Sequence, residues 1–237
     1  MGNDEAVMPS ITSANIACGF HAGDPSVARQ TVRFALASGV ALGAHPGFLD
    51  ILGFGRRAIQ LELQEVEDLV LYQISALAGI ASAEGGKLQH VKPHGALYNM
   101  AAKDRALADV IAHAVVAIDE TLVLFGLSGS CLLEAGQAQG LRVASEVFAD
   151  RAYTVDGSLV SRGEAGAVIH DPVNVVERGL QMVRDGKVAA VTGEQVSVQA
   201  DTICVHGDTP GAAELAARLR AGLEAAGVKA LAVGRPS

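Results

Sequence analysis

Three basic side chains alternate within residues 88–99, and their types are those used for proton transfer and anion binding. Alternate side chains of an extended strand lie on one face, so His90, Lys92 and His94 are expected to point the same way. Imidazole exchanges protons near neutral pH, and lysine can hold an anion or polarise a carbonyl oxygen. The pattern predicts a catalytic or binding face, with a solvated face of an exposed strand as the plain alternative.

Polar side chains of the same kinds come at the ends of other predicted strands. The carboxyl ends of parallel strands meet at one rim of a barrel, where the catalytic groups of such enzymes lie. Core or loop packing explains one such histidine equally well, but the pattern recurs at five strand ends. These residues are His21 after 11–18, His45 after 40–44, Lys92 and His94 in the third strand, Asp150 and Arg151 after 142–149, and His206 and Asp208 after 202–205.

The elements that would position these groups alternate between strand and helix. Such alternation predicts a parallel sheet with helices outside it. We expect strands at 11–18, 40–44, 121–127, 142–149, 202–205 and 229–233, and a further strand that begins at residue 88. We expect helices at 25–38, 61–83 and 171–185, and three more helices that end near residues 118, 139 and 226. A hairpin is expected at 188–199.

The faces of these strands favour a barrel over an open sheet. Thr202, Cys204 and His206 share one face, opposite the apolar Ile203 and Val205. An open doubly wound sheet needs two apolar faces, whereas a barrel buries one face under its helices and turns the other toward its mouth. We therefore predict a closed or nearly closed (β/α) barrel that forms a single domain over residues 1–237.

Composition and charge narrow the class of protein. A net charge of −8 without a basic stripe predicts that the chain has no nucleic-acid partner. Cys18, Cys131 and Cys204 are far apart, so we expect reduced thiols rather than disulfides or a zinc knuckle. The sequence shows no apolar run of about 18 residues. We therefore expect a cytoplasmic protein that does not enter a membrane.

Two ligand-binding patterns stay open at this point. His21, His45 and Asp24 could hold a divalent metal, although their spacing is not diagnostic. Residues 207–211 precede a predicted helix, where they could bind an anion or simply cap the helix. The sequence contains no phosphate-binding loop of the G-x-x-x-x-G-K-S/T type, so a nucleotide would need another kind of site.

Six segments in order resemble the LamB/YcsF family: residues 15–24, 43–48, 53–57, 91–99, 146–153 and 206–211. The likeness covers essentially the whole chain. It implies a deviant (β/α) TIM-like barrel of the glycoside hydrolase/deacetylase type. It also implies one component of an ATP-dependent hydrolase, a 5-oxoprolinase, that opens the cyclic amide of 5-oxo-L-proline to give L-glutamate. ATP with Mg²⁺ would be the co-substrate of the complex, and subunits B and C the partners.

The beginning of the sequence departs from the family pattern. Members usually begin with a further strand that reads Asp-Leu-Asn-x-Asp-x-Gly-Glu, which is not found here. The expectation is a barrel that is short at its N-terminus and lacks its first strand. A native start and a misplaced start stay open as explanations.

The resemblance and the strand ends together suggest roles. Lys92 with Arg56 or Arg57 would hold the substrate carboxylate or polarise the lactam oxygen, and histidines oriented by carboxylates would move protons. A metal-dependent deacetylase-like hydrolase, a homo-oligomer and a non-catalytic lactam-binding subunit are left open. The expected catalytic residues are Lys92, His94, His45, Asp150, His206 and Asp208, and the expected substrate-binding residues are His21, Asp24, Arg56, Arg57, Tyr98, Asn99 and Arg151.

Overall fold

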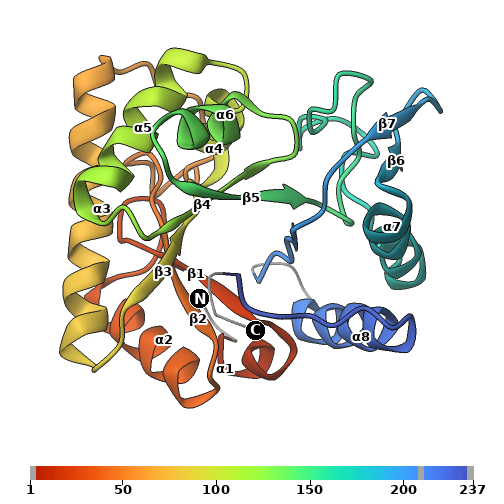
Figure 1. The fold of residues 1–237 in the computed structure, drawn as a ribbon, viewed down its shortest axis with the longest axis horizontal. Helices are drawn as coiled ribbons and strands as arrows, with labels where there is room; N and C mark the ends of the chain where they lie inside the picture. Colours follow the sequence, from red (N-terminus) through yellow and green to blue (C-terminus); the bar gives the residue numbers. More distant parts are fainter. Residues whose placement is uncertain (1–3, 208–210, 234–237) are drawn as a thin grey trace.

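A curled parallel sheet organises the chain, as seen in a computed structural model that describes residues 4–207 and 211–233 (Figure 1). The strand order is β1-β2-β3-β4-β5-β8, and every neighbouring pair is parallel. Among the described residues, β1 and β8 are the two edges and do not pair. The strands are β1 Ser13–Ala17, β2 Ala41–His45, β3 Leu88–Val91, β4 Val123–Leu127, β5 Arg142–Val147 and β8 Thr202–Ile203.

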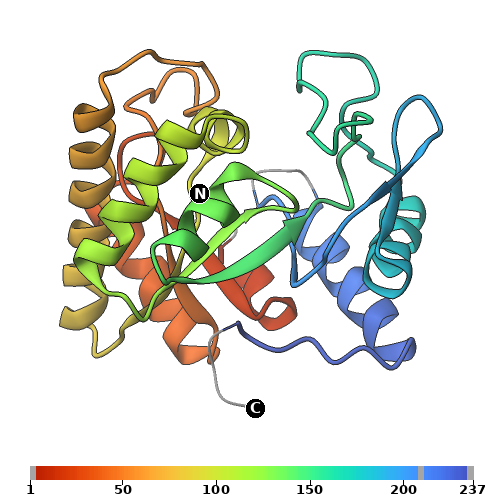
Figure 2. The same ribbon diagram turned by 45° about the horizontal axis from the view of Figure 1, so that its top comes forward.

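Helices cover the outer side of the curled sheet, and a smaller layer follows β5 in the sequence (Figure 2). That layer includes the antiparallel hairpin β6 Lys187–Ala189 and β7 Gln195–Ser197, whose turn uses Gly193 at φ 97°. The described helices are α1 Asp4–Val7, the 3₁₀ helix η1 Met8–Ser10, α2 Pro25–Ala37, α3 Leu63–Ala83, α4 Gly95–Ala101, α5 Arg105–Ile118, α6 Cys131–Ala138, α7 Pro172–Asp185 and α8 Ala212–Ala225.

The main core lies between the outer face of the sheet and the helices. Helix α3 shows why, because Val66, Val70, Ile74 and Leu77 recur at helical spacing and are all buried. They belong to one apolar cluster that also contains Leu124 and residues of α2 and α5. By length and hydropathy, α3 is the one described helix that could cross a membrane. In this fold its apolar stripe is instead packed in the core.

The inner face of the sheet carries polar side chains beside the apolar Val123, Phe125 and Ala144. His90 of β3 is fully buried there, with its ring stacked on Phe125 at a centroid distance of 4.3 Å. Its Nε2 lies 2.9 Å from Asn15 Oδ1 of β1. Gly43 of β2 leaves room for this ring, since a Cβ at that position would lie 1.9 Å from His90 Nε2. The glycine therefore allows a histidine to fill the interior of the curl.

Two sequence expectations about strands are wrong. The third strand ends at Val91, so Lys92 and His94 lie in the loop after it rather than along it. Pro93 cannot donate to a strand ladder, and the chain turns into α4 at Gly95, which has φ 56°. Residues 229–233 form no strand. Val233 instead packs against Val123 and other apolar residues on β4 and β5.

The Gly43–His90 contact can be tested by stability. Gly43→Ala should lower the free energy of unfolding by about 1–3 kcal/mol, because the new methyl group forces the buried ring to move. Gly79→Ala is the control, because nothing lies within 4 Å of a Cβ there and α3 would gain a better helix former. Urea denaturation measures both. Equal stability of the two variants would show that the interior tolerates a side chain at Gly43.

Candidate functional site

A cavity of about 1140 Å³ opens where the strands of the curled sheet end, and it continues past β1 toward α1 and α8. It brings together most of the residues predicted from the strand ends. Asp24, Arg57 and Asp150 are not among its lining residues, and Asp208 lies outside the described residues. The predicted residues that line it are His21, His45, Arg56, Lys92, His94, Tyr98, Asn99, Arg151 and His206.

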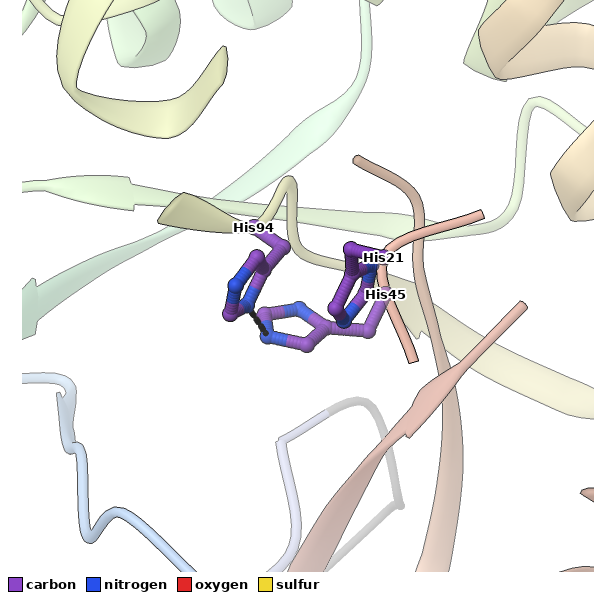
Figure 3. A group of neighbouring side chains, drawn as sticks. All are labelled: His21, His45 and His94. Atoms are coloured by element: carbon purple, nitrogen blue, oxygen red, sulfur yellow. Dashed lines mark hydrogen bonds between the residues drawn. The ribbon is translucent and has the colours of Figure 1, made fainter. Parts of the chain in front are cut away.

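Three imidazoles meet on one side of this cavity, and we call them the histidine cluster: His21, His45 and His94 (Figure 3). They come from the loop after β1, the end of β2 and the loop after β3. The rings of His21 and His94 stack at 3.8 Å, and His94 Nδ1 lies 3.0 Å from His45 Nε2. One ring nitrogen from each residue lies within 4.8 Å of the other two. The set can therefore converge on a single ion.

Backbone carbonyls determine which nitrogens of the cluster carry hydrogen. His45 Nδ1 lies 2.6 Å from the Lys92 carbonyl oxygen, and His94 Nε2 lies 2.8 Å from that of Phe54. A carbonyl only accepts, so both of these nitrogens donate. In neutral rings, His45 Nε2 and His94 Nδ1 then face each other with lone pairs. Such a pair needs a shared proton or a metal ion between its nitrogens.

The surroundings of the histidine cluster disfavour a shared proton between His45 and His94. Burial, followed by the charges of His94 and Arg56, lowers the pKa of His21 to about 3. Burial and the neighbouring His94 and Lys92 hold the pKa of His45 well below its ordinary value. His21 Nδ1 is buried and has no hydrogen-bond partner among the described residues. Neutral imidazoles are the form that ligates metals, so the cluster fits a cation.

Asp24 does not join the histidine cluster, contrary to the sequence expectation. Its Oδ1 accepts hydrogen bonds from the backbone N–H groups of Ser26 and Val27, at 2.8 and 2.9 Å. Asp24 is therefore the N-cap of α2, whose first residue is Pro25. His94, not Asp24, supplies the third nitrogen or oxygen donor beside His21 and His45.

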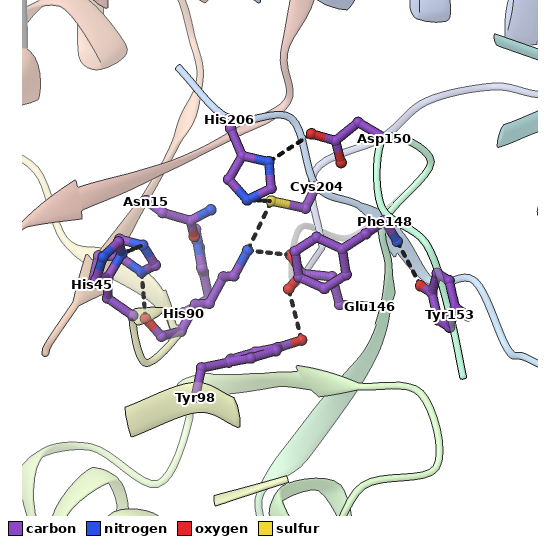
Figure 4. Close-up of polar contacts among 12 residues, drawn as sticks. Asn15, His45, His90, Tyr98, Glu146, Phe148, Asp150, Tyr153, Cys204 and His206 are labelled. Carbon is purple, nitrogen blue, oxygen red and sulfur yellow. Dashed lines mark hydrogen bonds and ion pairs between the residues drawn. The ribbon is translucent and has the colours of Figure 1, made fainter. Parts of the chain in front are cut away.

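A buried ion pair of Lys92 and Glu146 also lines the cavity, and Figure 4 labels its neighbours Tyr98 and Cys204. Lys92 Nζ lies 2.7 Å from Glu146 Oε1 of β5, and these side chains are 5% and 1% exposed. The Tyr98 hydroxyl donates to Glu146 Oε2 at 2.9 Å, and Lys92 Nζ lies 3.1 Å from Cys204 Sγ. Burial opposes the charge of Lys92, but Cys204 and Glu146 outweigh it and raise its pKa. We call these four residues the lysine network.

The lysine network contains two residues that the sequence expectations missed. Glu146 lies in a predicted strand and Cys204 shares the polar face of another, but nothing in the sequence pairs either with Lys92. Contacts across 54 and 112 residues of chain bring them together. The polar-face alternation that places Cys204 beside His206 is the one sequence signal that could have found it.

His206 and Asp150 form a second charged pair beside Cys204. His206 Nδ1 lies 2.8 Å from Asp150 Oδ2, and its Nε2 lies 4.0 Å from Cys204 Sγ. Burial opposes a charge on His206, but Cys204 and Asp150 outweigh it and raise the pKa to about 9. Burial also opposes the charge of Asp150, yet the hydrogen bond from His206 lowers its pKa overall. At neutral pH this pair is an imidazolium and a carboxylate.

The predicted arginines have different surroundings. Arg56 lines the cavity, and its guanidinium lies 4.8 Å from the Phe54 ring centroid. Arg57 instead pairs with Asp50, with Nε 2.9 Å from Oδ1, and holds the loop closed outside the cavity. Arg151 donates to two backbone carbonyls of the 160–167 loop. Burial and the nearby Arg162 lower the pKa of Arg151 to about 10. Asn99 is exposed at the cavity lining.

These features define an α/β protein whose acid–base groups gather at the carboxyl ends of parallel strands, the position typical of enzyme sites. The sequence profile of the LamB/YcsF family matches residues 1–236, and the chain belongs to this family. The family expected from the six sequence segments is thereby confirmed.

Relatives of known name match nearly the full chain. A Tolumonas auensis protein, named as the A component of 5-oxoprolinase, is 60% identical over 229 residues, covering 97% of this chain and 91% of that protein. One from Bordetella pertussis with the same name is 58% identical over 228 residues, covering 96% and 90%. The crystal structure of a lactam utilization protein from Thermus thermophilus matches with a TM-score of 0.91 and 49% identity, covering 98% of this chain and 93% of that one.

The buried ion pair generates a stability prediction. Lys92→Met should lower the free energy of unfolding by about 3–5 kcal/mol, because Glu146 would remain charged and buried without its partner. The double variant Lys92→Met/Glu146→Leu should recover part of this loss. Lys103→Met is the control, since its pair with Asp156 is exposed and contributes about 0–1 kcal/mol. Guanidinium denaturation gives the values. A loss no larger than that of Lys103→Met would contradict the pairing.

The His206–Asp150 pair generates a pH prediction. The folded-state pKa of His206, about 9, lies above its ordinary value of 6.5, so the imidazolium stabilises the folded state. That stabilisation is fully present below pH 6.5 and is lost as the pH rises through about 9. His206→Asn should therefore be less stable than the unsubstituted chain near neutral pH, and this difference should shrink in alkali. Thermal melting across this range, with the exposed His113→Asn as control, measures it. A difference that does not change with pH would exclude the raised pKa.

Proposed function

We propose that this chain is the A component of an ATP-dependent 5-oxoprolinase. The enzyme would hydrolyse the ring amide of 5-oxo-L-proline to give L-glutamate, together with subunits B and C. The observation that carries the proposal is the 60% identity, over 97% of this chain, to the Tolumonas auensis protein that bears this name. The Thermus thermophilus neighbour, titled a lactam utilization protein, supports the same substrate class.

The charges around the cavity suit this substrate. At neutral pH, 5-oxo-L-proline is a small anion with one carboxylate and one cyclic amide. The net charge of the chain is −8, yet Arg56, Arg162 and Lys92 all line the cavity. Local charge rather than net charge decides which ligand a cavity attracts. We assign Arg56 to the substrate carboxylate, because its side chain lines the cavity and that of Arg57 does not.

Acid–base roles follow from the surroundings of each histidine. Breaking the ring C–N bond requires a proton for the leaving nitrogen, and His206 carries one at neutral pH. Asp150 orients His206 through the 2.8 Å contact with Nδ1. Lys92 is paired with Glu146, so it acts within a neutralised network rather than as a free cation.

ATP with Mg²⁺ would activate the amide within the complex. Enzymes remove roughly 8–23 kcal/mol of a reaction barrier. One donor to a developing oxyanion supplies only about 3–4 kcal/mol, so phosphoryl activation of an unstrained amide would contribute much of the rest. The chain has no phosphate-binding loop of the G-x-x-x-x-G-K-S/T type, and we therefore assign the nucleotide to the complex as a whole.

The curled parallel sheet also supports a proposal about architecture. We assign it to the deviant (β/α) barrels of the glycoside hydrolase/deacetylase type, because helices cover its outer face (Figures 1 and 2) and acid–base groups gather at the carboxyl ends of its strands. An experimental structure with a helix packed across the inner face would exclude this assignment.

The proposed reaction is tested by glutamate release. The chain is mixed with purified subunits B and C, and L-glutamate is measured with and without ATP. Release that needs ATP, the chain and both partners supports the proposal. Absence of release from the complete mixture, or equal release without this chain, would reject it.

The carboxylate assignment predicts different behaviour for two neighbouring arginines. Arg56→Gln should raise the KM for 5-oxo-L-proline about tenfold to a hundredfold, because one charge-assisted hydrogen bond contributes about 1.5–3 kcal/mol. Arg57→Gln should leave KM unchanged, since that side chain holds Asp50. Initial rates of the reconstituted complex give both values. A raised KM for Arg57→Gln with an unchanged KM for Arg56→Gln would assign the substrate carboxylate to Arg57 instead.

The histidine cluster supports a second candidate, a metal-dependent amide hydrolase. The facing lone pairs of His45 Nε2 and His94 Nδ1 favour it, and three nitrogen donors suit zinc and similar divalent ions. When bound, such an ion supplies Lewis-acid chemistry at a carbonyl oxygen.

Metal binding can be measured without activity. We expect Co²⁺ to give the visible absorption of an ion with nitrogen ligands, and Zn²⁺ to displace it. His94→Ala should abolish this spectrum, whereas His113→Ala, an exposed residue paired with Glu67, should not change it. Release of product from amides by the metal-loaded chain without ATP would favour the metal hydrolase over the ATP-dependent enzyme. No spectral change with Co²⁺ would exclude the site.

A further inference from the structure

Cys204 contacts two charged side chains in the cavity, Lys92 and His206. It follows β8 directly, and its Sγ lies 3.1 Å from Lys92 Nζ and 4.0 Å from His206 Nε2. On its far side, His206 Nδ1 contacts Asp150 Oδ2 at 2.8 Å. Figure 4 shows the thiol, the imidazole and the carboxylate in that order.

The order thiol–imidazole–carboxylate is an arrangement that activates a nucleophile. The imidazole takes the thiol proton, and the carboxylate keeps the ring oriented and stabilises its charge. Cys204 Sγ lies 3.1 Å from Lys92 Nζ and 4.0 Å from His206 Nε2, so the thiol has a base within reach.

The other two cysteines lie away from this thiol–imidazole–carboxylate arrangement, although Cys131 has the Arg105 cation near it. Burial raises the pKa of Cys18 to about 12, although a backbone hydrogen bond at His45 opposes the rise. Cys18 Sγ donates to the Ile16 carbonyl instead of contacting a base. Cys131 is the first residue of α6 and does not line the cavity. The chain therefore provides an internal comparison for Cys204.

A second observation is the burial of the carboxylate. Asp150 is 6% exposed, and its Oδ1 has no hydrogen-bond partner among the described residues. A buried carboxylate oxygen without a partner is costly, so the fold holds Asp150 there for the sake of Oδ2 and its contact with His206. A thiol that only filled space beside Lys92 would not require this oriented imidazole.

We propose that Cys204 is the nucleophile of the reaction, with His206 as its acid–base partner and Asp150 as a positioning residue. The inference rests on the proposed function for the identity of the acyl group. ATP in the complex places a phosphoryl group on the lactam oxygen, and Cys204 Sγ bonds to the lactam carbonyl carbon as phosphate leaves. Water then adds to this carbon, and the ring C–N bond breaks as the proton held by His206 passes to the ring nitrogen. The product of this step is a γ-glutamyl thioester with a free α-amine.

Water completes the sequence and restores the site. His206 removes a proton from a water molecule, whose oxygen bonds to the thioester carbon as the C–S bond breaks. The sulfur leaves as a thiolate paired with the imidazolium, and the product is L-glutamate. One lactam, one ATP and two water molecules account for L-glutamate, ADP and phosphate without an oxidant or reductant.

The first experiment tests the thiol in the isolated full-length chain with iodoacetamide. We expect Cys204 to be alkylated at least about tenfold faster than Cys131, as peptide mass mapping would show. His206→Asn should reduce the rate at Cys204 about tenfold and leave Cys131 unchanged. Equal rates at the two cysteines, or no effect of His206→Asn, would overturn the proposal.

The second experiment measures turnover in the complex with subunits B and C. Cys204→Ser and Cys204→Ala should each reduce glutamate release by roughly a thousandfold with little change in KM. Cys131→Ser should keep the full rate. Acid quenching of the unsubstituted complex should trap a glutamyl group on the peptide that contains Cys204.

The outcomes separate this inference from the proposed function. An unsubstituted complex that releases no glutamate rejects the 5-oxoprolinase assignment, while alkylation still decides whether Cys204 is an activated thiol. An active complex that keeps its rate in both folded Cys204 variants overturns the nucleophile and leaves the 5-oxoprolinase assignment standing.

Discussion

The buried pair of Lys92 and Glu146 is the interaction on which the rest of the site depends. A charge left unpaired at this depth would cost several kcal/mol, so the loop after β3 and the strand β5 must come together. Tyr98 of α4 donates a hydrogen bond to Glu146, and Cys204 after β8 contacts Lys92. The backbone carbonyl of Lys92 also orients His45. One residue thus joins the histidine cluster to the lysine network.

Polar side chains enter the interior of the curl because small residues make room for them. Gly43 admits the ring of His90, and Gly95, at φ 56°, lets the chain enter α4 against the backbone of Gly55. A Cβ at Gly95 would lie 2.4 Å from the Gly55 carbonyl oxygen. His94, next to Gly95, can then donate to the Phe54 carbonyl. Backbone geometry therefore determines the positions of the imidazoles.

Much of this arrangement could be predicted from the sequence, and the rest required tertiary contacts. Alternation of strand and helix predicts a parallel sheet, so the strand pattern alone assigns His45, Lys92 and His206 to one rim. Asp24 precedes Pro25 at a helix start, and this N-cap signal outweighs the case for metal ligation. Residues 229–233 form an apolar run, and no local pattern reveals whether such a run has a partner strand. The ion pair of Lys92 and Glu146 joins distant segments, so no spacing could show it.

Histidines in the same cavity differ in charge because their neighbours differ. Burial, followed by the charges of His94 and Arg56, lowers the pKa of His21 to about 3, so its ring stays neutral and can ligate. His206 is also buried, but a carboxylate and a thiol beside it raise its pKa to about 9. A histidine whose pKa is lowered, such as His21, is suited to ligate a metal, whereas one whose pKa is raised, such as His206, is suited to donate a proton. Because these two environments come from different strand ends, the curl of the sheet is what lets one cavity contain both.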